Sequence, residues 1–382
     1  MINNKFVKGA EPFFGKYKKN ILKDIDYCLT TGNLSSGKFV NKFEGDLKNH
    51  FKSKFALSVS SGGIALELAI IALGLKGKEI IVPSQTFIAS PNAIVKAGAK
   101  PIFCDIDINT GCLDPKKVIK KINKKTGAIM FVHMFGIMTD DILKIKSFCN
   151  KKKIYLIEDA SHAHGAKLNG LYAGNIGDIG CFSLYATKIM TTGEGGFILT
   201  NNKKVFEEIK SLKNYGKNDK DQKFYKLSNN YRLSEISAIL GIYQLKMLNK
   251  FIEHRNNVAK IYYNKLKDVT HLKFFKNTSN TTNSFWRYPI YLSKKINKKK
   301  FQNSMLKKLI RITWMYEPLC HLQPLYNKKK QKFKVSERHI NQLINLPTHL
   351  KITKKIAAKI SISLINSIDE ITQKKNFNNR RK

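Results

Sequence analysis

The chain has 382 residues, of which 42% are hydrophobic, and a formal net charge of +42 at pH 7. This length is enough for a large core in two domains, which we expect at residues 1–250 and 251–382. The charge alone would suit a nucleic-acid partner, but the lysines are spread along the chain with many Asn and Ile. No RNP, zinc-finger or basic-zipper signature accompanies them, so we expect no nucleic-acid function.

Other classes of protein are also disfavoured. The longest apolar run, residues 64–75, is too short for a membrane span and contains Glu67. The N-terminus lacks the apolar segment of a secretory signal, so a cytoplasmic location is expected. The six cysteines have no C-x-x-C spacing, and we expect neither a metal site nor a redox pair.

The first strand leads into a small-residue turn. Helical patterns at residues 17–29 and 39–50 precede a predicted strand at 55–59, the turn Ser60-Ser61-Gly62-Gly63 and a helix at 64–73. A turn of this kind presents free N–H groups and the positive end of a helix dipole to an anion. The alternative is a simple helix cap formed by Ser61.

Strands and helices then alternate along the chain. Strands are predicted at 79–83, 101–106, 128–133, 154–158, 181–185 and 197–200, and helices at 86–97, 115–122, 139–150 and 203–213. This order predicts an α/β fold with a mainly parallel sheet between helices. Ligands bind beyond the carboxyl ends of such strands, where Phe87, Asp159, His162 and Lys188 lie.

A different pattern follows residue 202. A polar loop at 216–230 leads to predicted helices at 233–248 and 251–267, strands at 284–292 and 310–314, and helices at 298–308, 336–343 and 353–367. We expect a smaller α+β domain here, with Trp286 and Trp314 in its core or at its rim and a frayed tail.

Lys188 occupies an unusual place. It lies between two apolar strands and before the glycine-rich turn Thr191-Thr192-Gly193-Glu194-Gly195-Gly196. An ammonium group is costly to bury there unless it is paired or used chemically. We therefore predict that Lys188 is a reacting amine that holds an aldehyde cofactor as a Schiff base.

Asp159 follows the apolar strand 154–158 directly. Such a carboxylate usually caps a helix or is solvated. A carboxylate can also hold a heterocyclic nitrogen protonated, and the resulting pyridinium is the electron sink that pyridoxal phosphate supplies. The phosphate-type turn and Lys188 in the same chain favour this second interpretation.

Residues 35 to 350 resemble the DegT/DnrJ/EryC1/StrS family of sugar aminotransferases, which are fold-type-I enzymes dependent on pyridoxal 5'-phosphate. Six segments carry the resemblance, in the family's order: SVSSGGIALELAIIALGL, EIIVPSQTFIASPNAI, GAKPIFCDID, LIEDASHAHGA, GDIGCFSLYATKIMTTGEGGFILTN and NNYRLSEISAILGIYQL. Six separate segments are far more specific than any single motif.

The resemblance implies a role for each matching residue. Lys188 would be the Schiff-base lysine and proton shuttle, Asp159 would pair with the pyridine nitrogen, and His162 would lie near the ring hydroxyl. Phe87 would stack on the ring. The phosphate of the cofactor would be held by Gly62, Gly63 and Ser183. The resemblance also implies a homodimer with shared sites, in which Asn230 and Arg232 of the second subunit complete the phosphate site.

Two segments depart from the family's pattern. Gly63 stands where the family usually has Thr, which removes a hydroxyl from the phosphate site. The segment Pro318-Leu319-Cys320-His321-Leu322-Gln323-Pro324 is one residue longer before its histidine than the family's P-L-H-x-Q-P. His321 is carried over as a substrate-binding residue on this weaker match.

The resemblance implies transfer of an amino group from L-glutamate to a keto-sugar nucleotide, in amino-sugar or surface-polysaccharide synthesis. One alternative is that the enzyme acts on a cyclic ketone that carries no nucleotide and is the precursor of an aromatic amine or an aminocyclitol. A dehydratase of the same family would replace the Schiff-base lysine, so Lys188 disfavours it. A non-catalytic regulator that binds the cofactor is a further alternative, disfavoured by the complete set of Lys188, Asp159 and Ser183.

Overall fold

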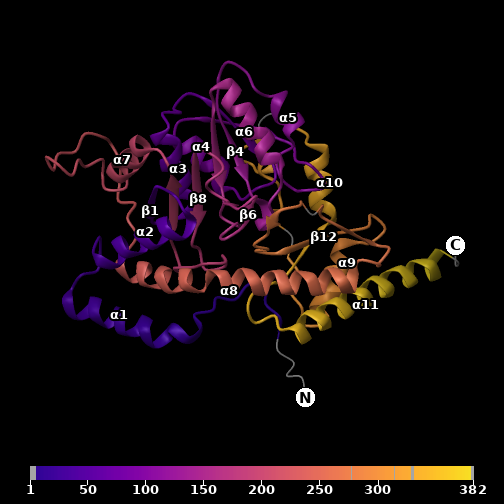
Figure 1. The fold of residues 1–382 in the computed structure, drawn as a ribbon. Helices are drawn as coiled ribbons and strands as arrows, with labels where there is room; N and C mark the ends of the chain where they lie inside the picture. Colours follow the sequence, from indigo (N-terminus) through magenta and orange to yellow (C-terminus); the bar gives the residue numbers. More distant parts are fainter. Residues whose placement is uncertain (1–5, 277, 314, 328–330, 380–382) are drawn as a thin grey trace.

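A computed structural model describes residues 6–276, 278–313, 315–327 and 331–379 (Figure 1). Its centre is a seven-stranded sheet with the strand order β1-β9-β8-β5-β4-β2-β3. The strands are β1 (Phe55–Val59), β2 (Glu79–Pro83), β3 (Lys100–Cys104), β4 (Thr126–Val132), β5 (Tyr155–Asp159), β8 (Ile179–Ser183) and β9 (Gly196–Thr200). Only β9 among them runs against the others, so the sheet is mainly parallel, as predicted.

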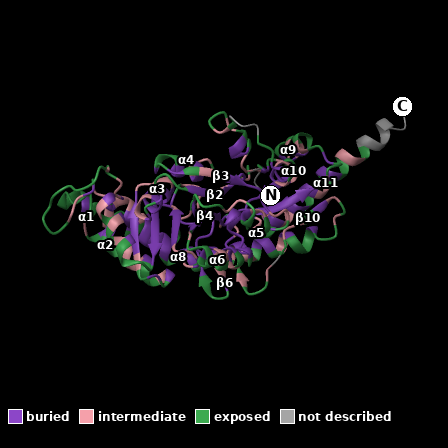
Figure 2. Ribbon diagram, turned by 90° about the horizontal axis from the view of Figure 1, so that it is seen from above, coloured by how far each residue is buried: buried purple, intermediate pink, exposed green. Residues whose placement is uncertain are grey.

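Helices cover both faces of this sheet because successive strand residues point to opposite sides. Ile80 and Val82 pack in one hydrophobic core with α3 (Gly62–Ala72), α4 (Ala89–Lys96) and α7 (Lys203–Leu212). Ile81 packs in the other core, with α2 (Lys38–Phe51), α5 (Pro115–Ile119), α6 (Asp141–Lys152) and the first half of α8. Figure 2 shows the buried strands between helices whose outer faces are exposed. The predicted α/β class is therefore confirmed.

A smaller three-stranded antiparallel sheet lies towards the C-terminus, with the order β10 (Leu272–Phe274), β12 (Tyr288–Leu292) and β13 (Leu343–Leu346). It shares a core with the second half of α8, with α9 (Lys298–Lys307) and with α11 (Lys354–Asn379). In the described part of the chain, the other elements are α1 (Lys18–Thr31), α10 (Lys334–Gln342), the short strands β6 (Lys167–Leu168), β7 (Leu171–Tyr172) and β11 (Thr281–Thr282), and single-turn 3-10 helices at Gly15–Tyr17, Met134–Gly136 and Cys320–Leu322.

One helix replaces the two predicted at 233–248 and 251–267. Helix α8 runs without a break from Glu235 to Leu266, and Figure 1 shows it crossing from the large sheet to the small one. Its residues 249 and 250 have no helix-breaking side chain, and both flanking segments are buried against different cores. Residues 249 and 250 lie on its exposed face.

Several other predicted boundaries were wrong. The predicted strand at 284–292 begins only at Tyr288, and residues 310–313 make only isolated bridges, Val7 with Ile310 and Thr313 with Asn345. Residue 314 lies outside the described residues. The helix predicted at 86–97 begins at Ala89, and α11 extends to Asn379, into the segment that we expected to fray. No helix among the described residues has the length and apolarity needed to cross a membrane.

A buried carboxylate ties α8 to α2. Glu235 is 1% exposed, and its carboxylate accepts hydrogen bonds from the backbone N–H groups of Gly37 (3.0 Å), Phe39 (2.9 Å) and Val40 (2.8 Å). These N–H groups belong to the first turn of α2, which has no partner for them within the helix. The contact fixes the N-terminal helices to the helix that crosses the molecule.

We predict that Glu235→Ala lowers the thermal unfolding midpoint by several degrees, because three buried donors lose their acceptor at a cost of about 2 kcal/mol or more. Differential scanning calorimetry measures this shift. Glu253→Ala, which removes an exposed carboxylate from the same helix, is the matched control and should leave the midpoint unchanged. Equal midpoints for the two variants would contradict the assignment.

Candidate active site

The turn after β1 forms one wall of the candidate site. Ser61 caps α3, with its hydroxyl accepting a hydrogen bond from the N–H of Ile64 at 3.2 Å. The helix-cap interpretation of Ser61 is therefore correct for its side chain. The N–H groups of Gly62 and Gly63 have no acceptor among the described residues, so they remain available to an anion at the helix N-terminus.

Gly62 lies against the end of strand β8. A Cβ atom at this position would be 2.6 Å from Cβ of Ser183 and 2.9 Å from its Cα, closer than such atoms can approach. The Ser183 side chain thereby comes beside the free N–H groups of the turn. At Gly63, by contrast, the nearest atoms to an added Cβ are 3.8 Å and 3.9 Å away, in Ser61 and Ala89. Only the first glycine is required by packing, and the second leaves room for a side chain.

Asp159 ends strand β5 and is 5% exposed. One carboxylate oxygen accepts a hydrogen bond from the hydroxyl of Ser90 at 2.8 Å, and the other accepts one from the N–H of Ser161 at 3.2 Å. The hydroxyls of Ser90 and Thr86 are 2.9 Å apart. These contacts fix the direction of the carboxylate from a neighbouring helix and from its own turn.

Lys188 lies on the turn between β8 and β9, with its backbone N–H bonded to the carbonyl of Tyr185 at 2.9 Å. The side chain is partly buried, and its Nζ has no hydrogen-bond acceptor in the part of the chain that the structure describes. Burial lowers the pKa of Lys188 to about 7; Asp159 opposes this shift and Arg287 adds to it. A buried amine near neutrality exchanges a proton readily.

Trp286 brings a third segment to this site. Its indole lies under the Lys188 amine, with Nζ 4.5 Å from the ring centroid, and it stacks on His162 at 3.9 Å with an interplanar angle of 14°. The indole Nε1 donates to the carbonyl of Thr187 at 2.7 Å. The placement of Trp286 in the core or rim of the small domain was therefore wrong.

Tyr316 and Phe87 complete an aromatic group around His162. The hydroxyl of Tyr316 is 3.0 Å from Nε2 of His162, and its ring centroid is 5.2 Å from that of Phe87. Phe87 is 52% exposed, which leaves a ring face free for a ligand. Burial, with Lys188 and Arg287 adding to it, lowers the pKa of His162 well below its usual range, so the imidazole is neutral.

Two buried arginines surround the tryptophan. Arg255 of α8 donates through Nη1 to the carbonyls of Phe285 (3.1 Å) and Trp286 (3.3 Å) and to the Thr348 hydroxyl (2.8 Å). The guanidinium of Arg287 lies 4.6 Å from the centroid of the Trp286 ring. Burial lowers the pKa of Arg255 to about 9 and that of Arg287 to about 10. No carboxylate among the described residues pairs with either, so both favour anions nearby.

The predicted second-subunit residues lie apart from this group. Asn230 is exposed, and Arg232 donates to the side chain of Asn214. The backbone carbonyl of Tyr231, between them, accepts a hydrogen bond from the N–H of Ser60 at 2.9 Å. The segment thus adjoins the β1–α3 turn of its own chain, with Asn230 exposed and Arg232 half-buried.

His321 is 1% exposed, and its described contacts are with Glu337 and with Phe333, which packs in a core of the large sheet. Its Nε2 is 3.3 Å from the carboxylate of Glu337, and its ring packs edge-on against Phe333 at 4.7 Å. The structure does not bring it into contact with Lys188 or Asp159. The neighbouring Cys320 is closer to the site, because its thiol donates to the carbonyl of Thr86 at 3.1 Å.

His133 and His164 serve the scaffold. His133 is 2.7 Å from Glu158, whose carboxylate also accepts hydrogen bonds from the N–H groups of Gly174 (2.8 Å), Ile176 (2.7 Å) and Gly177 (2.5 Å). His164 is fully buried and packs on the ring of Phe182, and burial lowers its pKa to about 3. The described residues contain no group of three or more potential metal ligands.

The sequence did not reveal Trp286, Arg287 or Tyr316 as site residues. All three follow irregular segments, far from the strand ends where ligands of parallel sheets are expected. The only available signal was an aromatic and a basic residue side by side in the run Asn-Ser-Phe-Trp-Arg-Tyr, which is weak by itself.

Known proteins are similar to this chain in sequence and in fold. The profile of the DegT/DnrJ/EryC1/StrS aminotransferase family matches residues 16–364. A GDP-perosamine synthase of Escherichia coli O157:H7 is 34% identical over 85% of this chain and 89% of its own. A dTDP-3-amino-3,6-dideoxy-alpha-D-galactopyranose transaminase of Aneurinibacillus thermoaerophilus is 32% identical over 87% and 91% of the two chains. Helicobacter pylori PseC, an aminotransferase of pseudoaminic acid biosynthesis, superimposes with a TM-score of 0.89 over 96% of this chain and 100% of its own, at 26% identity.

Gly62→Ala and Gly63→Ala form a matched pair that tests the turn. We predict that Gly62→Ala lowers the thermal unfolding midpoint by several degrees, since overpacking against Ser183 costs about 1–3 kcal/mol. Gly63→Ala should change the midpoint by less than about one degree, since an added methyl group has ordinary contacts there. Calorimetry of the two variants decides the matter, and a larger loss at Gly63 would refute the geometry.

The pKa of Lys188 predicts its reactivity towards acylating reagents. Because only the neutral amine reacts, modification of Lys188 in the cofactor-free enzyme should rise with pH through a midpoint near 7. Peptide mapping by mass spectrometry after timed labelling measures this rate, with the exposed Lys203 in the same digest as a control. A midpoint at the ordinary lysine value of 10.5 would show that the amine is not perturbed.

Proposed function

The chain belongs to the DegT/DnrJ/EryC1/StrS aminotransferase family, and from that membership we propose that it is a pyridoxal-phosphate-dependent aminotransferase of nucleotide sugars. The observation that carries the proposal is the Lys188 amine, partly buried, without a hydrogen-bonding partner among the described residues and close enough to Asp159 for the carboxylate to affect its pKa. An aminotransferase needs such an amine and such a carboxylate in one place.

The described residues fit the proposed cofactor. The free N–H groups of Gly62 and Gly63 and the hydroxyl of Ser183 are donors suited to its phosphate. The exposed face of Phe87 is suited to stacking on its ring, and the neutral His162 lies beside the same space. Asp159 would hold the ring nitrogen protonated, and Lys188 would be the attachment point.

When bound, pyridoxal phosphate withdraws electrons from the Cα of an amino acid, so that the Cα proton can be removed. The chain must supply a group that takes this proton and returns it elsewhere. Lys188 Nζ can do both near neutral pH, because a pKa of about 7 leaves about half of the amines unprotonated. Ser90 and Ser161 donate hydrogen bonds to the Asp159 carboxylate and keep it in the direction that it would need to face the ring nitrogen of the cofactor.

The proposed donor is L-glutamate, and the proposed acceptor is a 3- or 4-keto sugar carried on a nucleoside diphosphate. Both substrates are anions, and the buried guanidinium groups of Arg255 and Arg287 make the neighbourhood of Trp286 favourable for negative charge. The relatives named as a GDP-perosamine synthase and a dTDP-sugar transaminase support this class of acceptor. The product would enter amino-sugar or surface-polysaccharide synthesis.

The proposal also includes the wider organisation of the enzyme. The chain would act in the cytoplasm as a homodimer, with residues 1–250 binding the cofactor and 251–382 forming the small domain. Asn230 and Arg232 would reach the phosphate of the partner's site. Asn230 is exposed, and the half-buried Arg232 would exchange its hydrogen bond with Asn214 for one with that phosphate. His321 would then affect the sugar only indirectly, because its side chain is occupied by Glu337 and Phe333.

Lys188→Ala tests the central residue. We expect the wild type to show a near-visible absorption band that is lost on addition of L-glutamate, and to aminate members of a panel of 3-keto and 4-keto nucleotide sugars. The variant should lose at least about 1,000-fold in turnover, since both attachment and proton transfer are removed. Lys203→Ala is the control. Turnover of Lys188→Ala at the wild-type rate would exclude the proposed role.

The shared site predicts complementation between two inactive variants. Lys188→Ala and Arg232→Ala homodimers should each have low activity, but mixed dimers contain one site with both native residues. Refolding the two variants together should therefore restore about a quarter of the wild-type activity, given random pairing of equal amounts. Activity that stays at the mean of the two parents would place Arg232 outside its partner's site.

A further inference from the structure

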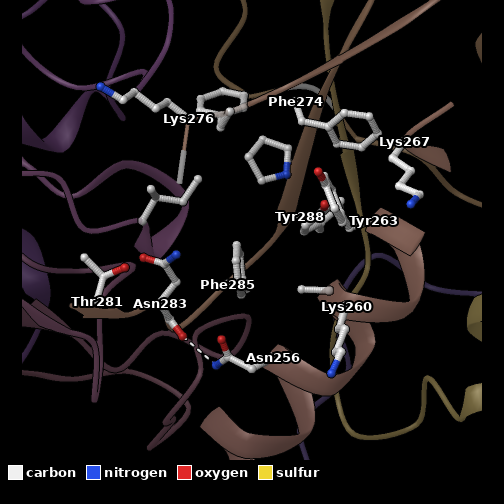
Figure 3. A pocket seen from close by; sticks show the side chains of 14 residues that line it. Asn256, Lys260, Tyr263, Lys267, Phe274, Lys276, Thr281, Asn283, Phe285 and Tyr288 are labelled. Carbon is white, nitrogen blue, oxygen red and sulfur yellow. Dashed lines mark hydrogen bonds between the residues drawn. The ribbon is translucent and has the colours of Figure 1, made fainter. Parts of the chain in front are cut away.

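A cavity of about 560 Å³ lies between the second half of α8 and the segment that runs from β10 to β12 (Figure 3). None of its lining residues belongs to the set around Lys188. The chain segment Asn283–Trp286 separates the two spaces, because Asn283 and Phe285 line the cavity while Trp286 stacks on His162. Its volume is within the usual range for small-molecule sites.

Two side chains at least nine-tenths buried offer unused polar groups at this cavity. Asn283 is 7% exposed, and its Oδ1 accepts a hydrogen bond from the N–H of Met138 at 2.8 Å, but its Nδ2 has no acceptor among the described residues. Tyr288 is 8% exposed, and its hydroxyl likewise has no described partner. Figure 3 shows these side chains on opposite sides of Phe285. Neither polar atom is among the fully buried, unpaired atoms of the described residues, so both keep accessible surface and can hydrogen-bond a polar ligand in the cavity.

The walls and the rim specify the ligand further. Phe274, Phe275, Phe285 and Tyr263 line the cavity and provide aromatic surface for a flat ring. Lys260, Lys267 and Lys276 lie around them (Figure 3), and none of the three pairs with a carboxylate of the described residues. The described lining contains no acidic residue, so the cavity favours a negatively charged ligand.

We propose that this cavity is a second binding site, outside the catalytic centre, for an aromatic anion of the nucleoside phosphate class. The base stacks between the aromatic side chains, with Asn283 and Tyr288 available to its polar edge. The phosphates lie at the rim with the lysines. A nucleoside phosphate has a flat base for the aromatic walls, a hydrogen-bonding edge for the polar side chains, and charged phosphates for the lysines at the rim.

The site is directly connected to the catalytic centre. Ser284, between the two cavity residues Asn283 and Phe285, donates from its hydroxyl to the carbonyl of His162 at 2.9 Å. Trp286, which follows Phe285 directly, lies under the Lys188 amine. A nucleotide held against Phe285 therefore acts on a segment that positions the stacking partner of His162.

Hydrogen–deuterium exchange of the full-length enzyme with GDP or UDP, at 150 mM salt, tests the proposal. Peptides that cover residues 256–267 and 272–285 should exchange more slowly with either nucleotide. Guanosine and inorganic phosphate, each added alone at the same concentration, should give little protection. Failure of GDP and UDP to protect these peptides, or equal protection by guanosine or phosphate alone, would overturn the proposal.

Binding by calorimetry distinguishes the site from non-specific attraction to a basic protein. Lys267→Ala should weaken the nucleotide binding that protects these peptides by about threefold to fivefold, as for loss of one exposed ion pair. Phe274→Ala should weaken it about tenfold or more through loss of stacking. Lys265→Ala, an exposed lysine of the same helix that does not line the cavity, is the matched control. Equal effects of Lys265→Ala and Lys267→Ala would refute the site, whatever the amino-transfer assays show.

Discussion

Partial burial of an amine without an acceptor is the constraint on which the site depends. Water is the usual partner of a lysine ammonium, and its removal favours the neutral form. The Lys188 side chain contacts the face of Trp286 and has no hydrogen-bonding oxygen among the described residues, so burial outweighs the attraction of Asp159. The protein keeps this amine poised near neutrality, ready for a carbonyl group.

The sheet explains how the partners of Lys188 reach it. Strands β1, β5 and β8 run in the same direction, so the turn at Gly62, the carboxylate of Asp159 and the side chain of Ser183 all come to one edge. The antiparallel strand β9 begins at Gly196, which pairs with Ser183 at the end of β8, so both ends of the turn that carries Lys188 lie at that edge. The close contact between Gly62 and Ser183 makes this arrangement tight enough to exclude any other residue at position 62 without rearrangement.

The C-terminal part of the chain contributes Trp286 to the site and holds it by hydrogen bonds to main-chain carbonyls. Arg255, on the helix that crosses between the two sheets, holds the carbonyls of Phe285 and Trp286, and the indole reaches the Thr187 carbonyl beside Lys188. Helix α8 and the segment 285–286 are thus joined to the reactive turn by hydrogen bonds to main-chain carbonyls. A ligand that shifts residues 283–286 would therefore move Trp286 and change the surroundings of the Lys188 amine. This is the link between the second cavity and the reactive lysine.

The sequence by itself determined the α/β class, the strands that carry the site and the roles proposed for Lys188, Asp159 and the Gly62 turn. These features are local, because a strand, its turn and the residue that follows are read within a few positions. Only the tertiary structure decided that Trp286, Tyr316 and the two arginines join them, that residues 235–266 form one helix, and that His321 packs against Glu337 and Phe333. The contacts of His162 with Trp286 and Tyr316 join segments more than a hundred residues apart, and the contacts of Arg255 and His321 join segments 12 to 31 residues apart across irregular chain. The length of the helix depends on which core each of its faces meets, and none of these is encoded in local periodicity.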